Sequence, residues 1–378
     1  MPLLADNQLV DRILTHVDRG TTDCGDAVWR EPVAHYLDPA RLQAELGQVM
    51  RRSFTPFCPA AALRNPGDYV ARDAALVPIV AVRGSDGIVR AFRNACRHRG
   101  VQLVEGSGCT KALVCRYHAW TYALDGRLQA IPDSHGFPGI AKENHGLVPV
   151  AAIERHGMIF VRQDGDAAFD PTLEVLDGII GDEWRLVTSS ARAVDANWKI
   201  IAEGFLEGYH IRSTHNATFY PVQYHNLNVI EAFGSNNRIT FPYRKIEQQR
   251  DRAPADRSPR GAATKVYHLF PNVMLATFPT NINISVLEPL AADRTMMVDY
   301  LLTNQPADEA GDSLVRVGQD FVARGFAEDV EMTTASQRGL RAAANAHFTF
   351  GLFEAAIARL HGELAARLDG DGEREARA

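Results

Sequence analysis

Short apolar runs separated by turn residues dominate the first half of the chain, a texture typical of β-strands. Three stretches show it: residues 76–94, folded around Ser85-Asp86-Gly87; residues 120–131, around Asp125-Gly126; and residues 157–164. The first two have the form of β-hairpins, because a Gly-containing turn joins two apolar strands. We therefore expect a small all-β domain over residues 45–160.

The pattern changes in the second half. Residues 197–210 (NWKIIAEGFLEGYH) have apolar positions at helical spacing, and Asp195 or Asn197 can cap that helix. Apolar stretches that predict strands follow at residues 232–244, 265–278, 282–290 and 295–304. The polar, proline-containing residues 246–265 predict a mobile loop, and residues 312–367 predict a helical end. We expect a second domain over residues 161–378, and an N-terminal helical segment over residues 1–44 that packs on it.

Composition excludes several classes of protein. The chain has 378 residues and a formal net charge of −6, with no basic run that would suit nucleic acid and no apolar stretch long enough to span a membrane. The first residues lack the pattern of a secretion signal, so we expect a cytoplasmic protein. Five cysteines is an odd number in a large chain of this kind, so a disulfide framework is not expected.

Two of the cysteines lie next to histidines. Cys96-x-His98 is followed after sixteen residues by Cys115-x-x-His118, and both pairs lie on loops between predicted strands. Four such ligands in two pairs predict a metal site. Because each pair is mixed, it suits a Rieske [2Fe–2S] cluster, in which two thiolates hold one iron and two imidazoles hold the other.

A structural zinc site remains an alternative, although common zinc pairs contain two residues of one kind. The flanking residues suit a shell that donates to the cluster or packs over it: Arg97, Arg99, Tyr117 and Trp120. Cys24, Cys58 and Cys109 have no partner at ligand spacing, so we read them as buried core residues or surface thiols.

A second metal site is predicted from His210 and His215. Five residues apart, they do not share one face of a regular helix, so His215 should follow a broken turn. Two histidines and one carboxylate form the facial triad of non-haem Fe(II) oxygenases. For the carboxylate we favour Asp329, with Glu331 and Glu328 as alternatives.

The sequence resembles the catalytic α subunits of Rieske non-haem iron oxygenases, also called aromatic-ring-hydroxylating oxygenases. CRHRG (96–100) and CRYHAW (115–120) match the cluster motif of that family, and NWK followed by E-x-x-x-E-x-Y-H-x(4)-H, from Asn197 to His215, matches its iron motif. FPN (270–272) and Glu-Asp-x(7)-Gln (328–337) recur at corresponding places. The resemblance covers roughly residues 28–365.

This resemblance implies an α+β fold, with a Rieske [2Fe–2S] domain and a helix-grip-like catalytic domain whose curved antiparallel sheet wraps around a long helix. It implies that Cys96, His98, Cys115 and His118 hold the cluster and that His210, His215 and Asp329 hold the mononuclear iron. Glu207 matches the carboxylate that connects a cluster histidine of one subunit to an iron-ligand histidine of its neighbour, which implies a homotrimer.

The implied activity is that of an oxidoreductase, a Rieske monooxygenase or dioxygenase that activates O₂ and hydroxylates or demethylates a small organic substrate, aromatic or amine. Electrons from NAD(P)H would come through a separate reductase, possibly with a ferredoxin, because the chain shows no dinucleotide motif. The alternatives are an electron-transfer protein with a degenerate catalytic domain and a zinc-stabilised binding protein. Candidate pocket residues are Leu206, Phe219, Phe270, Met274 and Phe278.

One position departs from the family pattern. Many members have Asn after the first Glu of the iron motif, whereas this chain has Gly204 after Glu203. A glycine inside a helix costs roughly 1 kcal/mol relative to alanine. It either accommodates a bulky neighbour or loosens the helix before its ligands.

Overall fold

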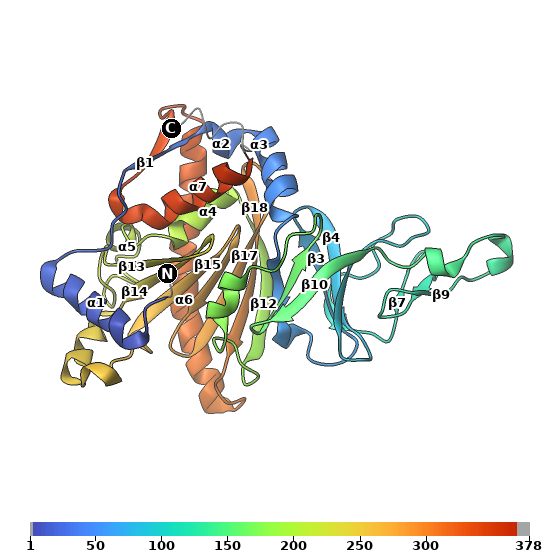
Figure 1. Cartoon of the computed structure of the whole chain (residues 1–378), viewed down its shortest axis with the longest axis horizontal. Helices are drawn as coiled ribbons and strands as arrows, with labels where there is room; N and C mark the ends of the chain where they lie inside the picture. The colour runs from blue at the N-terminus through green and yellow to red at the C-terminus, as the bar shows by residue number, and fades with distance from the viewer. Residues whose placement is uncertain (1–2, 369–378) are drawn as a thin grey trace. The chain divides into compact units, whose positions relative to one another are not determined.

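The computed structural model describes residues 3–368, and these form two compact units (Figure 1). Of the described residues, unit 1 takes those up to Val49, Asp170–Val175 and those from Val187 onward, and unit 2 takes Met50–Phe169 and Leu176–Leu186. No helix within residues 3–368 combines the length and the apolar character needed to cross a membrane.

Unit 2 is built from β-strands and short 3₁₀ turns. Its larger sheet has the order β2-β11-β10-β5-β4-β3-β6. The strands are β2 (Thr55–Pro59), β3 (Asp68–Ala74), β4 (Val77–Arg83), β5 (Val89–Arg93), β6 (Gly106–Cys109), β10 (Pro149–Arg155) and β11 (Met158–Arg162). A second sheet contains β7 (Leu113–Val114), β8 (Thr121–Tyr122) and β9 (Leu128–Ala130). The predicted hairpins are confirmed as β4–β5 and β8–β9.

The turn between β8 and β9 shows why glycine is required there. Gly126 has a φ of +88°, a value that side chains disfavour. A Cβ at Gly126 would also lie 2.4 Å from the ring of Phe92, which is buried in the core of the unit. The Asp-Gly signal in the sequence therefore marks both a turn and a close approach to the first sheet.

Unit 1 is organised around a seven-stranded antiparallel sheet with the order β12-β18-β17-β16-β15-β14-β13. The strands are β12 (Arg185–Val194), β13 (Val229–Phe233), β14 (Asn236–Pro242), β15 (Ala263–Leu269), β16 (Val273–Thr277), β17 (Asn281–Ala291) and β18 (Arg294–Thr303). β17 is an interior strand, and nine of its eleven residues are buried, as expected for a strand that is covered on both faces. This mixed helix-and-sheet unit beside an all-β unit confirms the predicted fold class.

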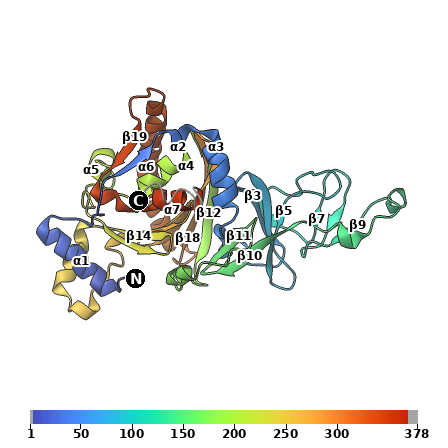
Figure 2. The ribbon, with the colours of Figure 1, turned by 45° about the horizontal axis from the view of Figure 1, so that its top comes forward.

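Helices complete unit 1. They are α1 (Asp6–Arg19), α2 (Ala34–Leu37), α3 (Pro39–Ala44), α4 (Trp198–Phe205), α5 (Ile211–Thr214), α6 (Glu309–Leu340) and α7 (Ala355–Leu368), and a two-stranded ribbon pairs β1 (Trp29–Pro32) with β19 (His347–Phe350). α4 packs against both α6 and β17, so it lies between the long helix and the sheet (Figure 1). α1 packs against the edge strand β13 and the segment after β14 through Leu9, Val10, Ile13 and Leu14. Figure 2 shows α1 at this edge of the sheet.

Three local expectations were wrong. The helix predicted over residues 197–210 ends at Phe205, and the helical stretch predicted over residues 312–367 is interrupted by β19, whose partner β1 is far away in sequence. Residues 246–265, expected to be irregular, include two 3₁₀ helices, Arg244–Asp251 and Pro254–Asp256. Ion pairs to α1 hold this segment: Arg250–Asp18, Arg257–Asp11 and Lys265–Asp6.

Candidate functional site

The first candidate site begins at helix α4. Asn197, rather than Asp195, caps the helix, because its side chain accepts a hydrogen bond from the backbone N–H of Lys199 at 2.9 Å. The helix ends at Phe205, and the next residues form a turn that places His210 directly before α5 and His215 directly after it. The two histidines therefore flank a single short helix, which is the broken geometry expected from their spacing.

His210, His215 and Asp329 converge at one point. The Nε2 atoms of the histidines lie 3.2 Å apart, and Asp329 Oδ1 lies 3.6 Å from Nε2 of His210 and 3.0 Å from Nε2 of His215. Adjacent ligands of an ion at about 2.1 Å are about 3 Å apart, so this separation fits a shared metal. Two imidazoles and one carboxylate on one side of an ion suit iron.

The other ring nitrogen of each histidine faces a carboxylate. Nδ1 of His210 bonds Glu207, and Nδ1 of His215 lies 2.7 Å from Oε2 of Glu328. Such carboxylates fix the tautomer and the ring orientation of metal-binding histidines. Although burial favours the neutral ring, the charge of Glu207 raises the pKa of His210.

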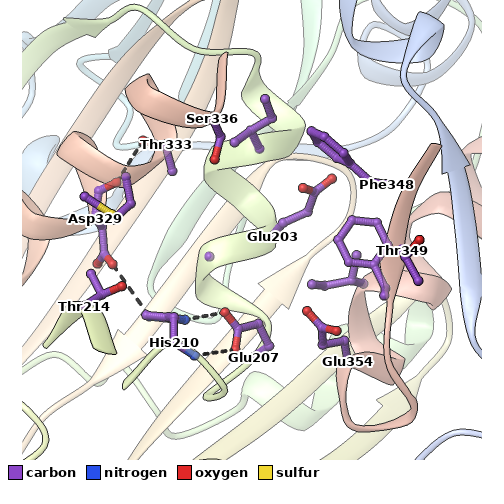
Figure 3. Close-up of a pocket in the computed structure, with 15 residues that line it drawn as sticks. Glu203, Glu207, His210, Thr214, Asp329, Thr333, Ser336, Phe348, Thr349 and Glu354 are labelled. Carbon is purple, nitrogen blue, oxygen red and sulfur yellow. Dashed lines mark hydrogen bonds and ion pairs between the residues drawn. The ribbon is translucent and has the colours of Figure 1, made fainter. Parts of the chain in front are cut away.

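The structure separates the three acidic candidates on α6. Oδ1 of Asp329 faces Nε2 of both His210 and His215; Figure 3 shows its contact with His210. Glu328 accepts hydrogen bonds from Thr218 and His215, which outweigh the effect of burial and lower its pKa. Glu331 is exposed and lies outside the converging group. Sequence reasoning weighed Glu328 only as a ligand and missed its contact with the outer nitrogen of His215.

A cavity of about 70 Å³ adjoins the converging group. Five phenylalanines line it: Phe205, Phe219, Phe241, Phe278 and Phe326. Of the pocket candidates chosen from sequence, Phe219 and Phe278 line it, whereas Leu206, Phe270 and Met274 are buried elsewhere in the core. Phe205, Phe241 and Phe326 were missed, because no sequence signal separates a cavity wall from ordinary core.

Glu207 and Glu203 face a second cavity, of about 330 Å³, on the side of α4 that Figure 3 shows. Gly204 lines both cavities, and a Cβ at this position would meet no atom within 4 Å. Because glycine replaces the asparagine that is common in the family, no side chain projects from this position of α4 toward the cavities that His210 also lines.

The second candidate site, in unit 2, is formed by two matching loops. Cys96 and Cys115 are both buried, and each carbonyl accepts a hydrogen bond from the amide four residues later, Gly100 or Ala119, at 2.9 Å. Gly100 and Ala119 both have positive φ, so the two loops turn in the same way. The loops thus present two buried thiols in equivalent backbone settings.

The histidines of these loops lie side by side. The rings of His98 and His118 are 4.7 Å apart, and both are more accessible than the thiols. Trp120 stacks on His98 at 5.0 Å, and Tyr117 packs on His118 at 3.8 Å. Two inner thiols and two outer imidazoles suit a [2Fe–2S] cluster with unequal irons.

Two further contacts concern residues flanking this site. The hydroxyl of Tyr122 lies 3.3 Å from Sγ of Cys96 and accepts a hydrogen bond from the backbone N–H of Arg97. The guanidinium of Arg99 donates to the hydroxyl of Tyr117. Tyr122 was not predicted; its only sequence signal is its position in the strand that follows the second loop.

Comparison with known proteins agrees with both sites. The Rieske [2Fe-2S] domain matches residues 53–147, and the ring hydroxylating alpha subunit (catalytic domain) matches residues 181–370. The carnitine monooxygenase oxygenase subunit of Acinetobacter baumannii is 32% identical over 199 residues, which are 50% of this chain and 53% of that protein. The alignment thus spans about half the length of that relative. The corresponding subunit of Escherichia coli is 27% identical over 332 residues, 83% of this chain and 84% of that protein.

Among solved structures, the quaternary ammonium Rieske monooxygenase CntA superposes with a TM-score of 0.78 at 23% identity, covering 89% of this chain and 94% of the other. At that identity the likeness shows the fold. The two family matches together cover most of the chain, and the residues of both candidate sites lie within the matched ranges. The chain therefore belongs to the Rieske oxygenase family of ring-hydroxylating α subunits.

Proposed function

We propose that this protein is the terminal component of a Rieske monooxygenase that oxidises a small quaternary ammonium compound. The observation that carries the proposal is the convergence of His210, His215 and Asp329 beside a phenylalanine-lined cavity. Hydroxylation of a carbon attached to the ammonium nitrogen would lead to cleavage of the C–N bond. The balance is R–H + O₂ + 2e⁻ + 2H⁺ → R–OH + H₂O.

Two metal groups fit the residues present. His210, His215 and Asp329 would hold the mononuclear iron, and Cys96, His98, Cys115 and His118 would hold the cluster. When bound, the iron would supply the site for O₂ and the cluster would supply stored electrons.

The chain's own side chains would prepare the iron site. Glu207 and Glu328 keep both histidine Nε2 atoms directed at one point by accepting hydrogen bonds from the opposite nitrogens. The phenylalanine rings would give the substrate a rigid, apolar wall beside the ligands.

The substrate class rests on two supports. Aromatic faces attract quaternary ammonium groups, and the residues that line the 70 Å³ cavity include Glu207 and Asp329 but no Lys or Arg. The two relatives named above are carnitine monooxygenase subunits, and the similar structure is that of a quaternary ammonium monooxygenase. Carnitine, a trimethylammonium compound, is therefore the first substrate to test.

The partners of this component are also part of the proposal. A separate reductase would deliver electrons from NAD(P)H, since the sequence has no dinucleotide motif. Glu207, which bonds His210 and faces an open cavity, is placed to receive a cluster histidine of a neighbouring subunit in a homotrimer. Location in the cytoplasm remains a prediction.

The direct test measures iron and sulfide in anaerobically reconstituted protein, followed by turnover with a surrogate reductase. We expect three irons and two sulfides per chain, with product formed from carnitine. His210→Ala should lose the mononuclear iron and product formation while keeping the visible spectrum of the cluster. His225→Ala is the matched control, because His225 lies nearby in sequence but outside the converging group.

A second candidate, hydroxylation of an aromatic ring, is supported by the same phenylalanine rings, which also suit a flat apolar substrate. A substrate panel of quaternary ammonium compounds and aromatic hydrocarbons, scored by product rather than by NADH consumption, separates the two. The electron-carrier alternative predicts two irons per chain, and the zinc alternative predicts a colourless protein.

A further inference from the structure

A buried network of ionisable side chains leads away from the iron-site cavity. It links Glu203 on α4, His361 on α7, Glu31 on β1 and His35 on α2. Nε2 of His361 lies 2.9 Å from Oε1 of Glu203, and Nδ1 of His361 lies 3.3 Å from Oε1 of Glu31. The same oxygen of Glu31 lies 2.6 Å from Nδ1 of His35. The four side chains thus form one continuous hydrogen-bonded chain.

One end of the network is exposed to solvent, and the other end lines a cavity. The side chain of His35 is 28% exposed, whereas the next three members are at most 9% exposed. At the other end, Glu203 lines the 330 Å³ cavity together with Glu207, His210 and Asp329 (Figure 3). Tyr36 and His361 both form their hydrogen bonds with Oε1 of Glu203. Within the described residues no donor is assigned to Oε2, so this oxygen is free to meet water in the cavity.

The charge states favour a mobile proton on His361. Burial by itself would lower the pKa of His361, but its hydrogen bonds to Glu203 and Glu31 raise it. Burial would raise the pKa of Glu31, but hydrogen bonds from His35 and His361 lower it. Burial and the charge of Glu203 raise the pKa of Tyr36, so its hydroxyl remains a donor. An imidazolium between two carboxylates can give a proton to either side.

Two further charges act on the cavity end. Lys199 and Glu354 both interact electrostatically with Glu203. Lys199 is itself neutralised by Glu45, at 2.6 Å. Burial and the charges of Glu207 and Glu203 raise the pKa of Glu354 to about 7. The cavity wall therefore keeps a surplus of carboxylates, which favours arrival of a proton.

Packing alone does not explain this arrangement. Burying ionised groups has a desolvation cost, and apolar side chains of equal volume often stabilise a protein as well or better. A structural tie between α7 and α4 needs only one histidine and one carboxylate. Here a second carboxylate and a second histidine extend the tie to the surface.

We propose that His35, Glu31, His361 and Glu203 form a proton relay from solvent to the cavity beside the iron ligands. The proton on Nε2 of His361 passes to Glu203, which gives it to cavity water and leaves His361 neutral, with its other proton on Nδ1. Rotation of the ring then turns the bare nitrogen toward Glu31, where a proton that enters at His35 and passes through Glu31 Oε1 restores the imidazolium. One proton enters and one leaves in each cycle, so the relay undergoes no net change.

This inference rests on the proposed function, because oxygenation consumes two protons for each O₂ reduced. The reductase supplies the electrons, and bulk water supplies the protons. Glu203 opens into the 330 Å³ cavity, which shares Glu207, His210 and Asp329 with the aromatic cavity, so a proton delivered there reaches water beside the iron ligands. Glu203 is the member of the network that lines the cavity, whereas Glu207 is already occupied by His210 and by the backbone N–H of Tyr209.

The test compares Glu203→Gln and His361→Gln, which break the chain, with Tyr36→Phe, which does not. We expect the two breaking variants to lose about 100-fold in product formation, as when a positioned proton donor is removed, and to show a changed pH profile and solvent isotope effect. Tyr36→Phe removes one hydrogen bond to the same carboxylate and should keep the wild-type isotope effect. Circular dichroism and iron content establish that each variant is folded and contains iron. If His361→Gln does not fold or does not bind iron, Glu31→Gln replaces it as the variant that breaks the chain, at a position nearer the surface.

A second readout does not depend on iron. In metal-free protein, ¹⁵N NMR of His361 should show both ring nitrogens protonated at neutral pH, with the pKa lowered by Glu31→Gln or Glu203→Gln. A neutral His361 in the wild type would overturn the relay, as would wild-type turnover and isotope effects in both breaking variants, or equal losses in Tyr36→Phe. If the wild-type enzyme forms no oxygenated product, the proposed function fails, whereas the NMR result still decides whether His361 carries the proton.

Discussion

Replacing Gly204 by alanine should stabilise the protein, even though Gly204 lies beside the candidate iron ligands. The residue is in the last turn of α4, and its φ is outside the left-handed region, so alanine can adopt its backbone. A Cβ at this position meets no atom within 4 Å. The substitution therefore removes the conformational freedom of glycine from the unfolded chain without a clash in the folded one.

The magnitude follows from helix propensity. Alanine is favoured over glycine by about 1 kcal/mol in a helix interior, and the effect is smaller near a helix end, so we expect about 0.5–1 kcal/mol. For a domain of this size, 1 kcal/mol shifts Tm by about 2–4 °C. Iron content should not change, because the new methyl group points into open space.

Gly208→Ala is the matched contrast, four residues further along. There a Cβ would lie 2.5 Å from Oδ1 of Asn228 and 3.3 Å from the ring of Phe241. Asn228 is fully buried and cannot swing into solvent, so overpacking should destabilise the protein by about 1–3 kcal/mol. Urea unfolding of both variants measures the two effects. A loss of stability in Gly204→Ala, or none in Gly208→Ala, would refute the packing described around α4.

Three further predictions use other parts of unit 1. Burial lowers the pKa of His268 from 6.5 to about 4, so between these pH values the unfolded chain binds a proton that the folded chain does not bind. The free energy of unfolding should therefore fall by up to about 3 kcal/mol as pH drops from about 6.5 to about 4. Urea titrations of His268→Gln should lack this component of the pH dependence. Lys199→Met removes the ammonium 2.6 Å from the buried carboxylate of Glu45 and leaves only the longer ion pair with Arg41, at 3.4 Å, so it should cost about 3 kcal/mol in urea unfolding. Adding Glu45→Gln should recover part of this loss; no recovery would contradict a paired charge. Glu328→Gln should weaken iron binding by about 10- to 100-fold in a chelator competition, whereas Glu331→Gln, on the exposed face of the same helix, should bind iron like the wild type.

Local signals predicted much of the fold. Asp-Gly and Ser-Asp-Gly turns between apolar runs marked the hairpins of unit 2, because short-range turn chemistry decides a hairpin. The cap at Asn197 likewise marked the start of α4. The interruption of the C-terminal helical stretch was not predictable in this way, because β19 exists only by pairing with β1, whose residues 29–32 lie at the other end of the chain. Tertiary pairing there overrides local propensity.

The candidate sites divide along the same line. Cys96, His98, Cys115 and His118 lie within 23 residues of one another, and their spacing alone indicated a cluster. The role of Glu328 depends on rotation about α6, since neighbouring residues of a helix point about 100° apart and only one of them can face the histidine Nε2 atoms. The sequence indicated an acidic ligand within residues 328–331. It could not distinguish the carboxylate that faces the metal from the carboxylate that holds a histidine ring in place.

The network around His361 lies beyond any such signal. Its members come from β1, α2, α4 and α7, and the hydrogen bond between Tyr36 and His361 joins residues 325 positions apart. Each member alone reads as an ordinary polar residue in an unremarkable segment. The four side chains form a connected network only in the folded protein, where packing leaves one end exposed to solvent and the other end at the cavity. The metal ligands of this protein can thus be predicted from sequence motifs. The proposed proton relay cannot, because it depends on how segments without a common motif pack together.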